Sequence, residues 1–122
     1  MQSHFRTIVL LLSILFVGLF YLPPTVHATG ICDSVTEIPL AECQALEAVY
    51  NSTGGDSWTT NTDWMQTNTP CSWFGVECGS GHVTELSLNY NRLVGSLPSE
   101  IDNLANLQIL YVHHNLSQCF FQ

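Results

Sequence analysis

The sequence predicts an α/β solenoid, a fold in which short strand-and-turn coils stack along one axis. Two observations predict it: an amphipathic segment at residues 40–51, and an apolar pattern from residue 83 onward that recurs at a fixed interval. The positions that recur are Val83, Leu86, Leu88 and Asn91, which return as Leu107, Leu110, Val112 and Asn115. One such coil cannot bury its own faces, so this period predicts stacked coils with a cover at the exposed end.

The N-terminal segment 1–28 is expected to lie outside the fold. Ile8–Leu22 is a run of fifteen residues that are almost all apolar, and two prolines follow it. Val26-His27-Ala28 then matches the small-x-small pattern of a cleavage site, which predicts a signal peptide at residues 1–28 and a secreted, extracellular product. The alternative is an uncleaved signal anchor, although the run is shorter than the ~20 apolar residues that cross a bilayer.

Charge limits the partners of the mature chain. Residues 29–122 hold ten acidic residues, one arginine (Arg92) and no lysine, a formal charge of −9. Nucleic acid binding needs clustered Lys and Arg, and so does contact with an anionic membrane. We therefore expect no nucleic acid partner and no membrane contact by the mature chain, and we interpret the acidic side chains as a solvated surface.

The spacing of apolar side chains in residues 40–51 predicts an amphipathic helix. Pro39 suits the first position of a helix, and Gly54 and Gly55 would end it. Glu42 and Glu47 are expected to face away from the core. The apolar side would hold Leu40, Cys43, Leu46, Val49 and Tyr50.

Three tryptophans follow the helix in a segment rich in Thr and Asn. Trp58, Trp64 and Trp73 are large apolar side chains, and we expect them to cover one end of a core. An aromatic binding cleft is the alternative interpretation.

The pattern of each repeat predicts a short strand, followed by a segment that leads the chain back to the start of the next coil, which we call the return path. Leu86 and Leu88 would point inward on the strand. Asn91 would bond the backbone of the turn that leaves it. The return path would be lined by Leu93, Leu97, Ile101 and Leu104.

The pattern L-x-x-L-x-L-x-x-N, followed by "NRLVGSLPSEIDNLANLQIL", resembles the plant-type leucine-rich repeat. Gly95, Leu97 and Pro98 fill the positions that are diagnostic of that type. Upstream, "ALEAVYNSTGGDSW" and "CSWFGVEC" are similar to the N-terminal cap of receptor-like kinase ectodomains and polygalacturonase-inhibiting proteins. The resemblance runs from about Cys32 to Asn115.

The resemblance implies a helix and a short hairpin as the cap, about one and a half repeats, and the disulfides Cys32–Cys43 and Cys71–Cys78. It divides the chain into a signal peptide (1–28), a cap (29–82), repeats (83–115) and an aberrant tail (116–122). Two such short-loop bridges would each contribute ~2–3 kcal/mol. The chain has five cysteines, so Cys119 is expected to be free.

The resemblance also places ligand binding on the concave strand face. The ligand class it implies is protein, peptide or glycan. The opposing interpretation is that two coils make too small a patch, since a specific interface buries ~800 Å² per partner. The candidate residues are Glu85, Ser87, Asn89, Tyr90, Ile109, Tyr111 and His113.

No catalytic motif is recognisable, so we expect no enzyme, no cofactor and no metal. Glu77 and Glu85 are interpreted as solvated carboxylates. His113 and His114 are expected to point to opposite faces of a strand, which disfavours zinc. Asn51 is the expected glycosylation site, because the sequon at Asn115 would be hidden by a folded second coil.

The tail "SQCFFQ" has no Gly or Pro where a second coil should turn. We interpret it as an interruption, such as a frameshift or a truncated gene product. Two functional hypotheses follow. The first is an extracellular recognition module. The second is a truncated, non-binding structural remnant, the capping fragment of a longer leucine-rich repeat protein or receptor.

Overall fold

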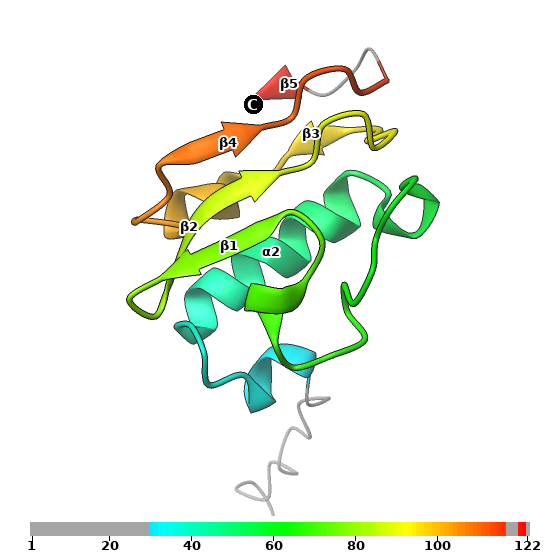
Figure 1. Cartoon of the computed structure of the whole chain (residues 1–122). Coiled ribbons are helices and arrows are strands. Elements are labelled where there is room, and N and C mark those ends of the chain that lie inside the picture. The colour runs from blue at the N-terminus through cyan, green and yellow to red at the C-terminus, as the bar shows by residue number, and fades with distance from the viewer. Residues whose placement is uncertain (1–29, 117–119, 122) are drawn as a thin grey trace, which may run out of the picture.

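The computed structural model describes residues 30–116 and 120–121. The predicted signal peptide and Cys119 lie outside the described residues. Figure 1 shows the elements in sequence order, from a short 3₁₀ helix at the start of the described residues, through α2 and the hairpin, to β4 and β5 at the opposite end of the molecule. The order, with η for 3₁₀ helices, is η1 (Ile31–Ser34), α2 (Leu40–Ser52), η2 (Gly55–Ser57), η3 (Pro70–Ser72), β1 (Val76–Gly79), β2 (His82–Ser87), β3 (Ser96–Leu97), η4 (Ser99–Asn103), β4 (Ile109–Tyr111) and β5 (Phe120–Phe121).

The helix α2 follows Pro39 as predicted, and its end is followed by Gly54 in the left-handed conformation (φ 69°). Two side chains differ from the prediction. Leu40 is 49% exposed, whereas Glu42 is 3% exposed. The helical period correctly placed Cys43, Leu46 and Val49 inward. It could not show that β2 covers a second side of the helix and offers polar partners to Glu42.

The main sheet joins the hairpin to the first strand of the second coil. β1 pairs antiparallel with β2, and β2 pairs in parallel with β4. Each β2 residue lies opposite the residue one repeat further along the chain: Glu85 with Ile109, Leu86 with Leu110, and Ser87 with Tyr111. The predicted period therefore translates directly into stacked parallel strands, which confirms the solenoid fold class.

The return paths of the two coils also stack. β3 pairs in parallel with β5, with Ser96 opposite Phe120 and Leu97 opposite Phe121. These partners are again separated by one repeat, so the backbone at Phe120–Phe121 keeps the register of the coils although the Gly and Pro of the motif are missing. The interpretation of residues 116–122 as an aberrant tail stays a prediction.

The three tryptophans are core residues. Trp58, Trp64 and Trp73 are 6%, 0% and 1% exposed, which contradicts the alternative of an aromatic cleft. Trp64 stands at the centre, with ring centroids 5.0 Å from Trp58, 5.0 Å from Trp73 and 5.9 Å from Tyr50. Its indole N–H donates to the carbonyl of Phe74 (2.8 Å), which satisfies the one polar atom of the buried ring.

Two asparagines hold the successive levels together. The amide oxygen of Asn115 accepts from the backbone N–H groups of Asn91 (2.9 Å) and Leu93 (3.1 Å), and its amide nitrogen donates to the carbonyl of Leu88 (2.9 Å). Asn91 makes the equivalent contacts with Thr60, accepting from its N–H (2.7 Å) and donating to its carbonyl (2.8 Å). The loop at Thr60 therefore takes the place of a preceding coil, which is how the cap ends the stack.

Two disulfides fasten the cap, and they are the pairs that the resemblance implies. Cys32–Cys43 ties η1 to the first turn of α2, and Cys71–Cys78 ties η3 to β1. Cys32 and Cys43 belong to the core, and Cys71 and Cys78 pack against it.

Candidate recognition face

The sheet β1–β2–β4 has one covered and one uncovered side. Val76, Leu86 and Leu110 are directly paired across the three strands and point toward α2. Residues alternate along a strand, so the neighbouring paired positions lie on the opposite side. We call that side, which is turned away from α2, the outer face (Figure 1). Its paired residues are Glu77, Glu85, Ile109, Ser87 and Tyr111.

The outer face has an acidic row. Glu77 on β1 is opposite Glu85 on β2, so the two carboxylates are neighbours, and the apolar Ile109 follows at the next position on β4. Glu77 is exposed and Glu85 is half-buried. Among the described residues the one ion pair is His82 with Glu42, so neither Glu77 nor Glu85 has a cationic partner there. Like charges directly opposite one another in a sheet are destabilising.

A cluster of four rings lies at the carboxyl ends of β2 and β4 and in the turns that follow them. We call Tyr90, Tyr111, His113 and His114 the ring cluster. Tyr90 stacks on His114 with centroids 4.5 Å apart, and His113 lies 4.9 Å from His114 and 5.8 Å from Tyr111. All four residues are exposed, Tyr90 at 68% and Tyr111 at 44%. Such a surface offers aromatic faces to a ligand without rearranging the core.

The geometry of the two histidines differs from the prediction. They were expected to point to opposite faces of an extended strand, but β4 ends at Tyr111 and His114 is left-handed (φ 54°). Tyr90 is left-handed too (φ 54°), and these two turns bring the rings together. Within the described part of the chain, no three His, Cys, Asp or Glu side chains are grouped as a metal site would require.

The remaining candidate residues differ in their exposure to solvent. Ser87 is half-buried and Ile109 is 37% exposed, and both lie on the outer face. Asn89 is half-buried, and its amide oxygen is shielded from solvent without a hydrogen-bond partner. Sequence reasoning missed Glu77 as part of this face. Only the register of the hairpin places it opposite Glu85, and that register contains an irregularity between Glu77 and Cys78.

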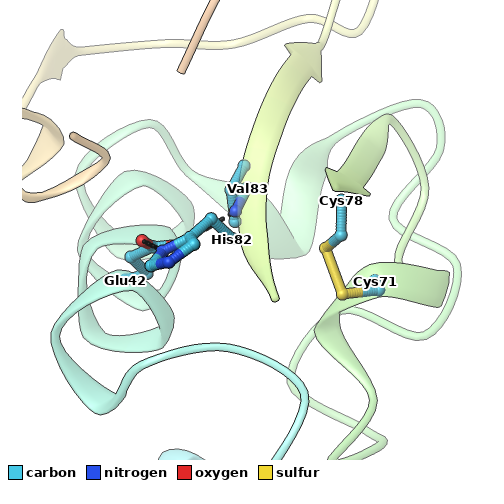
Figure 2. A network of polar contacts seen from close by, with 5 residues as sticks. All are labelled: Glu42, Cys71, Cys78, His82 and Val83. Atoms are coloured by element: carbon cyan, nitrogen blue, oxygen red, sulfur yellow. Dashed lines mark hydrogen bonds and ion pairs between the residues drawn. A yellow bond between two sulfur atoms is a disulfide. The ribbon is translucent and has the colours of Figure 1, made fainter. Parts of the chain in front are cut away.

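A buried carboxylate positions the start of β2 on the helix. Figure 2 shows Glu42 of α2 reaching the first two residues of the strand. The N–H of Val83 donates to Glu42 Oε2 (2.8 Å), and His82 Nδ1 lies 2.7 Å from Glu42 Oε1. Val83 is fully buried, so its N–H has no access to water, whereas the His82 side chain is 39% exposed. Glu42 therefore holds β2 against α2 from the core side and leaves the outer face free.

A separate hollow of about 250 Å³ lies at the end of α2, lined by Tyr50, Asn51 and residues 54–57. The Tyr50 hydroxyl donates to Asp56 (2.8 Å). Burial, and then this hydrogen bond, raise the pKa of Tyr50 above its ordinary value. Asn51 is exposed beside it, and its glycosylation stays a prediction.

No model of a known protein family matches the chain. Among curated proteins, the LRR receptor-like serine/threonine-protein kinase FEI 2 of Arabidopsis thaliana is 44% identical over 48 residues, which are 38% of this chain and 8% of that protein. Receptor-like protein 5 of the same plant is 33% identical over 58 residues, which are 48% of this chain and 21% of that protein. Over the matched segments the chain is similar to plant leucine-rich repeat receptor-like proteins, and its fold is that of a leucine-rich repeat. Its repeats are those whose strands form the outer face.

The leucine-rich repeat chain spans only a small part of these relatives, 8% of FEI 2 and 21% of Receptor-like protein 5. A solved leucine-rich repeat protein from Bacteroides eggerthii is similar to 57% of the chain, which corresponds to 13% of that structure, with a TM-score of 0.49 and 23% identity. No helix within residues 30–116 and 120–121 is long and apolar enough to cross a membrane.

Proposed function

We propose that this leucine-rich repeat chain is an extracellular recognition module that binds a protein, peptide or glycan through its outer face. One observation carries the proposal: the outer face is an uncovered side of a sheet that presents carboxylate and tyrosine side chains to solvent, and the ring cluster adds exposed tyrosine and histidine side chains at its end. Tyr is enriched where proteins bind one another, because it offers a large contact area with few rotatable bonds.

The scaffold favours such a role because it holds the face rigidly. The strands are held by two disulfides, by the asparagine contacts and by the Glu42 carboxylate, which reaches them from the side covered by α2. A face that is already ordered loses little conformational entropy when a ligand binds. The names of the relatives, receptor-like kinase and receptor-like protein, agree with a recognition role. Their kinase activity is not transferred to this chain, which covers a small share of them.

The small size of the face favours a peptide-sized ligand or a short protein segment. A standard protein interface buries ~800 Å² on each partner, and the described sheet offers three short strands. An extended peptide, in contrast, needs contact with only a few residues of each strand.

Secretion is part of the proposal. Disulfides persist in oxidising compartments, and this chain has two among its described residues. The exposed Asn51 lies in an N-x-S/T sequon, so a eukaryotic secretory host should glycosylate it. Digestion of the secreted product with a glycosidase should lower its mass, and Asn51→Gln should abolish that shift.

The binding proposal is tested with a displayed library of random twelve-residue peptides selected against the secreted protein. Selected peptides should bind the unmodified chain and fail to bind Ser87→Trp, which places a bulky ring in the middle of the outer face. Gln44→Trp is the matched control, since Gln44 is exposed on α2 and away from that face. The proposal is wrong if no peptide is selected, or if Gln44→Trp weakens binding as much as Ser87→Trp does.

A further inference from the structure

The outer face carries two different chemistries at its two ends. Glu77 and Glu85 of the acidic row lie on β1 and β2 near the hairpin, and the ring cluster lies at the carboxyl ends of β2 and β4 and in the turns that follow. We infer that the ligand of this face is an extended peptide segment that carries Lys or Arg side chains, one for the acidic row and one for the ring cluster. This inference rests on the proposed function and names its ligand class.

The acidic row supplies the charge complementarity. Two carboxylates face each other across β1 and β2 without a cation among the described residues, and a positive side chain placed between them would relieve their repulsion. The net charge of the chain also favours a positively charged ligand, because residues 29–122 carry a formal charge of −9 and contain a single arginine. The long-range field therefore attracts basic segments and repels acidic ones.

The ring cluster accepts a cation by a different mechanism. Tyrosine faces attract ammonium and guanidinium groups through the ring quadrupole. Tyr90 is 68% exposed, and its ring stacks on that of His114 with centroids 4.5 Å apart. A guanidinium can stack on such a surface while the rest of the peptide lies along the strands.

The spacing of the two ends suits an extended chain. Glu85 and Tyr90 are five residues apart along β2 and the turn that follows it. At about 3.3 Å per residue this corresponds to at most roughly 17 Å, the length of about five extended peptide residues. Side chains of an extended peptide alternate, so positions two or four residues apart can both point at the face. Ser87, between the two ends, is small enough for a backbone to pass over.

The experiment uses the secreted full chain and three synthetic nonapeptides of serine alternating with one other residue, which is Arg, Gln or Glu. Isothermal calorimetry should detect binding of the Arg peptide, with the Gln peptide at least tenfold weaker and no binding of the Glu peptide. Glu77→Gln combined with Glu85→Gln should weaken the Arg peptide about three- to tenfold, as expected for the loss of two solvent-accessible ion pairs.

Controls separate a specific site from general attraction to an acidic protein. Glu100→Gln combined with Asp102→Asn removes the same charge from η4, and it should leave the affinity for the Arg peptide within twofold. Tyr90→Asn removes a ring but keeps a residue that tolerates a positive φ, and it should also weaken the Arg peptide several-fold.

Equal losses for the two charge-neutralised pairs, or unchanged binding by both the Glu77/Glu85 pair and Tyr90→Asn, would overturn the inference. So would random-library selection of peptides that depend on Ser87 but are not enriched in Lys or Arg. That last result leaves the proposed recognition function intact. Failure of the library to yield any Ser87-dependent peptide removes the proposed function itself.

Discussion

Replacement of Glu42 by alanine should destabilise the protein far more than replacement of any other carboxylate on α2. The substitution removes the acceptor of the Val83 N–H, which is buried and has no water to replace it. A buried donor left without a partner costs ~1–3 kcal/mol. The lost contact with His82 adds at most ~1 kcal/mol, because that side chain is 39% exposed. Together the two contributions give an expected loss of about 1–4 kcal/mol.

The assay is urea unfolding followed by tryptophan fluorescence, because Trp58, Trp64 and Trp73 are buried and report on the core. Glu47→Ala is the matched control: it has the same charge change and helix propensity on α2, at a half-exposed site. Its expected loss is under ~0.5 kcal/mol. Glu42→Gln should fall between the two, since its amide oxygen still accepts from Val83. A loss for Glu42→Ala that equals the loss for Glu47→Ala would refute the reasoning.

Three further predictions concern other parts of the fold. Asn115→Ala should cost about 2 kcal/mol and speed hydrogen exchange at the Leu93 amide, because that amide loses its acceptor; unchanged exchange at Leu93 would contradict this. Because the pKa of Tyr50 is raised in the folded state, folding favours the neutral phenol. This stabilisation is complete below pH ~10 and is lost as pH rises through the folded pKa. Tyr50→Phe should therefore lose less stability than the parent as pH rises above about 10, and parallel curves would argue against it. Replacing Cys71 and Cys78 with serine should cost ~2–3 kcal/mol in thermal unfolding, and an unchanged melting temperature would show that the bridge adds nothing.

The repeated strands were predictable because the sequence period equals the length of one coil of the structure. Residues one repeat apart occupy equivalent places in successive coils, so Leu86 and Leu110 had to be neighbours once the coils stacked. The helix α2 was predictable for a similar reason, since its apolar positions follow the helical period. Asn115 could be assigned to the backbone ladder from its motif position alone, and its contacts to Leu88 and Leu93 bear this out.

Features that depend on distant partners were not predictable in the same way. Glu42 is buried because the N–H group of Val83, far along the sequence, needs an acceptor, and no local pattern records that need. The ring cluster depends on positive φ values at Tyr90 and His114, which are uncommon for such residues. The pairing of Phe121 with Leu97 was not predicted because the tail lacks the Gly and Pro of the motif, although the two residues lie one repeat apart in the sequence.

The most direct test of the account is to map where a ligand contacts the protein. A peptide selected from the random library should be titrated into the ¹⁵N-labelled secreted protein, and amide chemical shifts followed by NMR. Shifts should concentrate at the outer face, at Glu77, Glu85, Ser87 and Tyr111, and in the ring cluster. Shifts centred instead on the exposed side of α2 or on the hollow beside Asp56 would contradict the claim that the outer face is the recognition surface.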